Sequence, residues 1–351
     1  MLDPTERVPL GRTGVTVTRM GLGTAALGGL FRPVSEEQAR ATIEAAWEAG
    51  LRYFDTAPLY GYGLAERRLG EALRGRPRDA FCISTKVGRL LRSGLPHHPT
   101  EFDDRGALYY QGAPDLSLVY DYSYDGAMRS FEESLHRLGL DRVDILLIHD
   151  PDAVRLADSP EAHFRLVMEG AYRALGTLRD QGVVRAIGVG MNRVEMLVQF
   201  AREGEFDVFL VAGRYTLLDQ GALRALLPLC LERRIAVVIG GVYNSGILAD
   251  PRPGATFDYV RATPALLERA RRLAEVCGRW GVPLRAAAIQ FPLGHPAVVS
   301  VLSGSRSSAE LQENLAMFRY EVPDGLWDDL IAHGLLPPDV PRPRRAEGGG
   351  R

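Results

Sequence analysis

Four polar side chains with complementary chemistry are placed at or near the ends of predicted strands. Asp55, Lys86 and His149 each come directly after a short apolar run, and Tyr60 follows Asp55 by five residues. Because the carboxyl ends of parallel strands meet at one edge, we expect these four side chains to lie together. They therefore form the first candidate for a reaction centre.

Together these residue types suit hydride transfer at a carbonyl carbon, which needs a proton donor for the developing alkoxide. A tyrosine hydroxyl can donate that proton, but its ordinary pKa is about 10. A nearby lysine cation favours the phenolate, so Lys86 is expected to lower the pKa of Tyr60. Asp55 would hold Lys86 by a buried ion pair, and His149 would orient the substrate oxygen.

Each of these residues also has an ordinary structural explanation. An aspartate after a strand is commonly a helix cap or turn residue. A loop tyrosine usually packs, a lysine at a strand end is usually solvated, and a single histidine is usually structural. Chance placement of all four at one mouth is the weaker explanation, so we favour a shared site.

Apolar runs and helical patterns alternate along almost the whole chain, which predicts βα units. A hairpin is expected over 7–18, and the first helix has Ser35 as N-cap, Gln38 three residues later and Gly50 past its end. Strands are predicted at 20–24, 51–54, 80–85, 143–148, 183–189, 208–211, 235–239 and 298–302. Helices are predicted near 35–50, 64–73, 123–138, 161–181, 193–203, 219–233, 264–280 and 307–318.

Eight such units predict an α/β fold that closes into a (β/α)8 TIM barrel. An open doubly wound sheet is the alternative, but no G-x-G-x-x-G motif follows the first strand. Two long segments, 87–122 and 240–262, follow strands and should rise at the mouth as binding loops. We expect a single domain over 1–336, with a disordered tail over 337–351.

Composition excludes several classes of protein. The formal net charge of -2 gives no basic field for nucleic acid or anionic lipid, and 46% hydrophobic and 25% charged residues are ordinary for a soluble protein. No apolar run approaches the roughly 20 residues of a membrane span, and the polar N-terminus does not resemble a signal peptide. Three cysteines, without ligand spacing, suggest a reducing compartment. We therefore expect a cytoplasmic protein, while its oligomeric state stays open.

Several motifs resemble those of the aldo-keto reductase superfamily. They are FDTAPLYGYGLAERRLGEAL at 54–73, STKVG at 84–88, VDILLIHD at 143–150, GVVRAIGVGMN at 182–192 and SGSRSSAELQEN at 303–314. The similarity runs from about residue 7 to about residue 335. It implies an NAD(P)-dependent oxidoreductase whose tetrad is Asp55, Tyr60, Lys86 and His149. Tyr60 would do general acid/base work, with no metal and no flavin.

The resemblance also implies a nicotinamide site, with some departures. Thr24 and Asp55 would lie at the nicotinamide end, and Gly190 and Asn192 would contact the carboxamide. Met191 separates these two residues, where the family usually has Ser-Asn. Two further positions differ: Ala212 replaces a common glutamine, and Gly240 replaces the tyrosine that usually stacks on the ring.

At the adenosine end, the last strand leads into a helix N-terminus, which is a natural phosphate site. The residues implied there are Gly304, Ser305, Arg306, Ser307, Glu310 and Asn314. An ordinary serine-capped helix is the alternative. Relatives that prefer a 2′-phosphate often have cations where Gly304 and Glu310 stand, so we expect NAD to be preferred over NADP, although Arg306 could still pair with a 2′-phosphate.

The substrate branch is suggested by two stretches, 121–150 and 240–248. They resemble aldose 1-dehydrogenases of the fucose and threo-aldose types, and pyridoxal 4-dehydrogenases. The leading hypothesis is oxidation of an L-fucose-like aldose at C1 to a lactone. Pyridoxal oxidation comes second, and general aldehyde or ketone reduction is a further alternative. Tyr109, Tyr110, Tyr120 and Tyr122 could stack on a sugar, or simply pack on the barrel rim.

Two hypotheses from other classes remain. Some chains of this family act as nicotinamide-binding regulatory subunits with little turnover, and steady turnover of the isolated protein would separate that role from catalysis. A metal-dependent barrel hydrolase using Asp55 and His149 is disfavoured, because the chain lacks convincing ligand spacing such as an H-x-H pair.

Overall fold

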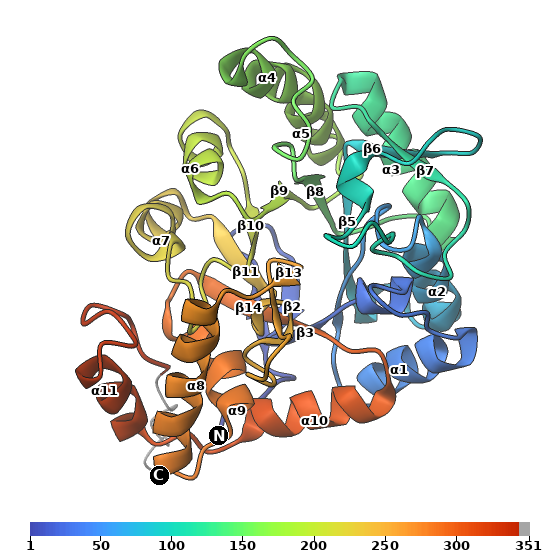
Figure 1. The fold of residues 1–351 in the computed structure, drawn as a ribbon. Coiled ribbons are helices and arrows are strands. Elements are labelled where there is room, and N and C mark those ends of the chain that lie inside the picture. The colour runs from blue at the N-terminus through green and yellow to red at the C-terminus, as the bar shows by residue number, and fades with distance from the viewer. Residues whose placement is uncertain (344–351) are drawn as a thin grey trace.

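Eight parallel strands close into a barrel in the computed structural model, which describes residues 1–343 (Figure 1). Around the barrel the order is β10-β11-β14-β3-β4-β5-β8-β9. The bounds are β3 Met20–Gly23, β4 Tyr53–Asp55, β5 Cys82–Val87, β8 Ile145–His149, β9 Ala186–Met191, β10 Val208–Ala212, β11 Ala236–Gly240 and β14 Val298–Gly304. The closed order confirms the predicted barrel and rules out the open doubly wound sheet.

Three strands end slightly later than the apolar runs predicted. Asp55, Lys86 and His149 belong to β4, β5 and β8 rather than following them. Parallel pairing extends into the mouth, where His149 pairs with Gly190 and Lys86 with Leu147. Backbone hydrogen bonding is independent of side-chain polarity, so hydrophobicity ended the predicted strands too early.

Helices surround the barrel and cover its strands (Figure 1). They are α1 Glu36–Glu48, α2 Leu64–Leu73, α3 Tyr124–Leu138, α4 Pro160–Val167, α5 Arg173–Asp180, α6 Val194–Glu203, α7 Ala222–Arg233, α8 Pro264–Arg279, α9 Leu284–Gln290, α10 Ser308–Arg319 and α11 Asp324–Ala332. The predicted capping box of α1 is present, since Ser35 accepts from the Gln38 amide at 3.1 Å. The helix predicted over 161–181 is divided by a π-helical turn, η4 Met168–Tyr172. Sequence patterns missed α9 and α11, which lie outside the simple βα repeat.

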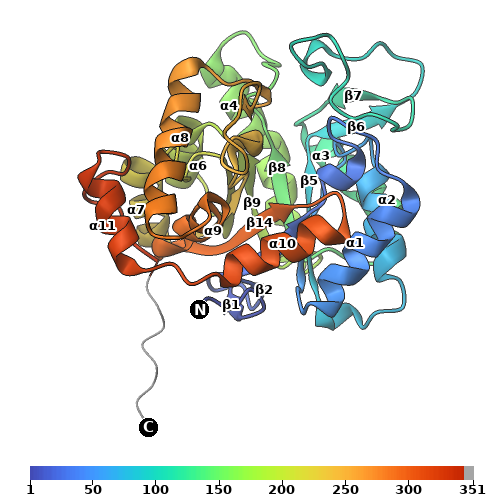
Figure 2. The ribbon, with the colours of Figure 1, turned by 60° about the horizontal axis from the view of Figure 1, so that its bottom comes forward.

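The N-terminal hairpin closes the bottom of the barrel. β1 Arg7–Pro9 pairs with β2 Thr16–Thr18, as predicted, and Figure 2 shows them below the barrel strands. Their side chains Val8 and Val17 share one buried cluster with the barrel-lining Tyr53, Leu147 and Val238. This plug leaves the carboxyl ends of the strands as the end where a site can be built.

The two long segments contain more structure than their sequences indicated. Within 87–122 an antiparallel pair forms from β6 Arg89–Arg92 and β7 Ser117–Tyr120. Within 240–262 a small hairpin forms from β12 Thr256–Phe257 and β13 Val260–Arg261. Short 3-10 turns complete the described chain: η1 Ala26–Gly28, η2 Arg78–Ala80, η3 Pro99–Glu101, η5 Asn244–Gly246 and η6 Phe291–Gly294.

The start of the C-terminal segment is packed, so the expectation of a disordered tail from residue 337 is wrong for 337–343. Val340 is buried, Asp339 lies 3.6 Å from Arg224, and Arg342 pairs with Asp328 of α11 at 2.6 Å. An apolar anchor and two ion pairs among the prolines hold this stretch on the barrel. Residues 344–351 lie outside the described residues. Within 1–343 no helix is long and apolar enough to cross a membrane.

Candidate active site

Asp55 and Lys86 form a buried ion pair at the ends of adjacent strands β4 and β5. Lys86 Nζ lies 3.0 and 2.8 Å from the two Asp55 carboxylate oxygens and donates to the Thr56 carbonyl at 2.8 Å. Ser84 Oγ adds a 2.6 Å hydrogen bond to Asp55. Both charged side chains are almost fully buried. Three oxygen partners therefore fix the ammonium, as the sequence had predicted for Asp55.

Tyr60 lies in the turn after β4 and covers this ammonium. Lys86 Nζ is 4.7 Å from the centroid of the Tyr60 ring, and the ring lies edge-on to His149 with centroids 5.8 Å apart. The turn is held by a close backbone approach, because a Cβ on Gly28 would come within 2.6 Å of the Tyr60 carbonyl carbon. The structure thus brings all four predicted side chains together.

The environment of Tyr60 corrects one expectation. Its pKa is raised well above 10, chiefly because burial disfavours the phenolate, and secondly because the charge of Asp55 opposes a second anion. Lys86 is paired with Asp55, and its positive charge does not outweigh burial and the charge of Asp55, so the pKa of Tyr60 stays above its usual value. The neutral phenol of Tyr60 is therefore a proton donor, and additional positive charge in the site would favour its phenolate.

His149 is held neutral at the end of β8. Burial, followed by the nearby cations Arg89 and Lys86, places its pKa well below 6.5. Its backbone is fixed because the Tyr122 hydroxyl donates to the His149 carbonyl at 2.7 Å. Its Nδ1 is buried and has no hydrogen-bond partner within 1–343. A neutral imidazole can orient an oxygen by a hydrogen bond without adding charge to it.

The predicted adenosine end lies where β14 leads into α10. Ser307 caps the helix by accepting from the Glu310 amide at 3.2 Å, and Glu310 Oε2 accepts from the Arg306 amide at 2.8 Å. Asn314 donates to Ser305 at 3.1 Å. Ser307 and Glu310 therefore cap the N-terminus of α10, as expected if this is an ordinary serine-capped helix.

A phosphate still fits this helix end. Among the described residues, the amides of Ser308 and Ala309 have no hydrogen-bond acceptor outside the helix, and Arg306 Nε is buried without a partner. Nothing lies within 4 Å of a Cβ built on Gly304, so there is open space beside the strand end. Free amides at a helix N-terminus and a guanidinium are suitable partners for a pyrophosphate or ribose phosphate.

The residues predicted for the nicotinamide end line the same mouth. The Thr24 hydroxyl donates to the Asp55 carbonyl at 2.9 Å, so its direct role is to hold β4. The Asn192 carbonyl accepts from Arg214 at 3.1 Å, while its side-chain amide has no hydrogen-bond partner within 1–343. Gly190 and Gly240 end at the mouth in β9 and β11, and a Cβ on Gly190 would be 3.4 Å from Lys86 Cε. Together, the free amide of Asn192 and the amides of α10 fit a dinucleotide.

Sequence reasoning missed several polar groups around the tetrad. Asp150 lies beside His149, with its carboxylate 3.4 Å from His149 Nε2 and 2.8 Å from the buried Arg89. Tyr109 and Tyr259 meet above the mouth, with ring centroids 5.9 Å apart. Asp150 directly follows His149 in the sequence, and this position could have marked it as a site residue. The loops that bring Arg89 and Tyr259 here follow different strands, so no local pattern connects them.

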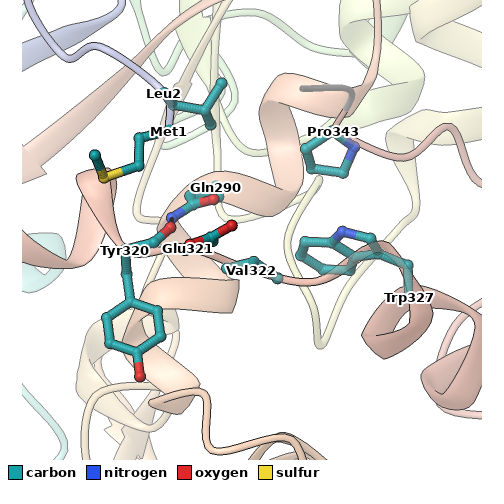
Figure 3. A pocket seen from close by; sticks show the side chains of 8 residues that line it. All are labelled: Met1, Leu2, Gln290, Tyr320, Glu321, Val322, Trp327 and Pro343. Carbon is teal, nitrogen blue, oxygen red and sulfur yellow. Dashed lines mark hydrogen bonds between the residues drawn. The ribbon is translucent and has the colours of Figure 1, made fainter. Parts of the chain in front are cut away.

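Other candidate sites in the described chain are less suited to chemistry. Residues 1–343 contain no group of three or more His, Cys, Asp or Glu side chains placed to hold a metal ion. Figure 3 shows a small pocket near the N-terminus, lined by Met1, Leu2, Gln290, Tyr320, Glu321, Val322, Trp327 and Pro343. None of the predicted site residues lines it. The mouth tetrad remains the place where acid, base and cation meet.

The chain is similar to known oxidoreductases over nearly its whole length. The profile of the aldo/keto reductase family matches residues 19–333. Pyridoxal 4-dehydrogenase of Microbacterium luteolum is 46% identical, covering 95% of this chain and 99% of that protein. D-threo-aldose 1-dehydrogenase of a Pseudomonas species is 41% identical, covering 92% and 96%.

Solved structures show the same fold at low identity. An aldo-keto reductase of Bacillus halodurans has a TM-score of 0.69 at 22% identity, covering 98% of this chain and 99% of that one. Glycerol dehydrogenase of Gluconobacter oxydans has a TM-score of 0.68 at 21% identity, covering 97% and 98%. The profile match and the two relatives, taken with the mouth geometry, show that this chain is a nicotinamide-dependent oxidoreductase belonging to the aldo/keto reductase family.

Proposed function

We propose that this enzyme oxidises an aldose at C1 to a lactone, with an L-fucose-like sugar as the leading substrate. The observation that carries the proposal is the convergence of Tyr60, Lys86 and His149 with further hydroxyl and carboxylate groups at one mouth. Such a lining suits a polyhydroxylated ligand. The 41% identity to a D-threo-aldose 1-dehydrogenase supports the same class of substrate.

The tetrad divides the chemistry of this oxidation. When bound, an oxidised nicotinamide would supply the hydride acceptor and a positive charge. Tyr60, as the phenolate, would accept the proton of the C1 hydroxyl, so that loss of hydride from C1 leaves the carbonyl of the lactone. His149, neutral and fixed by Tyr122, donates a hydrogen bond that orients the reacting oxygen. Lys86, held by Asp55, lies 4.7 Å from the centre of the Tyr60 ring, where its positive charge would favour the phenolate that accepts the proton.

The test is turnover by the isolated protein with NAD and a panel of aldoses, followed at 340 nm. Steady turnover of L-fucose or related aldoses supports the proposal and excludes a regulatory subunit with little turnover. Absence of turnover on every aldose defeats it. Pyridoxal belongs in the same panel as the second candidate, because the 46% identical relative is a pyridoxal 4-dehydrogenase.

We also propose that NAD is preferred over NADP. Gly304 borders open space but has no positively charged side chain to place there. The Glu310 carboxylate lies at the helix end and accepts a hydrogen bond from the Arg306 amide. A carboxylate there repels a 2′-phosphate. The kcat/KM ratio of the two cofactors tests this, with Gly304→Lys as a variant that should raise the relative use of NADP. A clear NADP preference of the unmodified protein would contradict the proposal.

We propose a reducing, cytoplasmic location because the cysteines form no disulfide. Cys82, Cys230 and Cys277 are all buried and unpaired. Thiol titration of the protein purified without reductant and then unfolded should give three free thiols per chain. Fewer than three would contradict this location.

A further inference from the structure

Asp150 presents a carboxylate to the mouth directly beside His149. It has a left-handed backbone, with φ of 38°, which aspartate tolerates better than most residues. Its amide donates to the Gly190 carbonyl at 2.9 Å, and its own carbonyl accepts from the Tyr122 hydroxyl at 3.0 Å. These bonds hold an uncommon conformation, which is typical of functional positions. The side chain keeps 33% exposure, while that of His149 keeps only 7%.

The carboxylate is only partly satisfied by protein. Oδ2 accepts from Arg89 at 2.8 Å, and Oδ1 has no hydrogen-bond partner within 1–343. The distance of 3.4 Å to His149 Nε2 is longer than a normal N–H···O hydrogen bond. Arg89 Nε is likewise buried without a partner within 1–343. Because buried polar groups are normally paired, a polar group of a ligand could bind beside Arg89 and Asp150.

The surrounding residues define what that ligand would meet. The charge of Asp150 acts on the phenols of Tyr60, Tyr110 and Tyr259, and the Arg89 guanidinium stacks 5.4 Å from the Tyr120 ring. Phenols can donate or accept, whereas the carboxylate of Asp150 only accepts. A substrate group that reaches Asp150 must therefore donate a hydrogen bond, as a hydroxyl does.

We propose that Asp150, supported by Arg89, binds the hydroxyl on the carbon next to the reacting carbon and thereby selects sugars that carry it. This inference rests on the proposed aldose oxidation and narrows its substrate class to vicinal hydroxyl compounds. In the proposed mechanism the reacting oxygen is bound by Tyr60 and His149, and Asp150 adjoins His149 on the more exposed side. The neighbouring substituent is therefore the group within its reach.

The experiment compares L-fucose with 2-deoxy-L-fucose in the unmodified holoenzyme and in Asp150→Asn. The unmodified enzyme should prefer L-fucose by about 10- to 100-fold in kcat/KM, because the half-buried Asp150 carboxylate loses a hydrogen bond when the hydroxyl is missing. Asp150→Asn should reduce kcat/KM for L-fucose by a similar factor, mainly through KM. Its loss on 2-deoxy-L-fucose should be at least tenfold smaller.

The outcomes separate the two proposals. No turnover of either sugar by the unmodified enzyme rejects aldose oxidation itself. Equal use of both sugars by the unmodified enzyme rejects only the role of Asp150, and this comparison needs no variant to fold. Equal losses on both sugars in Asp150→Asn would show that the residue merely supports His149, and would likewise overturn the inference.

Discussion

Replacing Lys86 with methionine should destabilise the protein, because it leaves the Asp55 carboxylate buried without its cation. Asp55 is 2% exposed, and after the change it keeps only the 2.6 Å hydrogen bond from Ser84. Breaking a buried ion pair by removing one partner costs about 3–5 kcal/mol of unfolding free energy. At about 2 °C per kcal/mol, this lowers Tm by roughly 6–10 °C.

The double variant Asp55→Asn/Lys86→Met removes both charges and separates stability from chemistry. It should recover most of the lost Tm, since an uncharged pair of similar volume avoids the desolvation cost. Turnover should stay low in both variants, because each lacks the cation beneath Tyr60. Thermal unfolding followed by circular dichroism, together with steady-state kinetics, measures the two effects.

A result that would refute this reasoning is a Tm for Lys86→Met within about 1 °C of the unmodified protein. It would mean that the Asp55 carboxylate becomes hydrated or protonated at little cost in free energy. A double variant that is no more stable than Lys86→Met would also refute it, since the loss would then come from packing rather than from an unpaired charge.

Three further predictions concern the same mouth. Tyr60→Phe should lower kcat by about 10²–10⁴-fold while leaving Tm nearly unchanged. Tyr122→Phe should instead lower the unfolding free energy by about 1–3 kcal/mol, because it removes the hydroxyl that donates to the His149 carbonyl. Equal Tm losses in the two variants would contradict this contrast. Because the pKa of His149 lies below 6.5 in the folded state, stability should fall as pH drops from 6.5, by up to about 1.4 kcal/mol per unit, and urea titrations of His149→Gln should show a smaller slope. Gly28→Ala should reduce kcat/KM about 100-fold by displacing the Tyr60 backbone, and unchanged kinetics would show that the approach is not restrictive.

The sequence alone was sufficient to predict the barrel and the meeting of these four side chains at its mouth. Repeated apolar strands and capped helices are local patterns, and eight of them have one common way to bury both faces of a parallel sheet. The family motifs then assigned Asp55, Tyr60, Lys86 and His149 to one mouth. The structure agrees with this placement.

Only the tertiary structure determined the electrostatics of that mouth. From sequence, Lys86 was expected to lower the pKa of Tyr60, but burial and the charge of Asp55 raise it instead. Arg89, the first residue of β6, reaches Asp150 across a separation of 61 residues in the sequence. Desolvation and charge pairing depend on which groups surround a side chain in three dimensions, and a linear pattern of residue types does not contain that information.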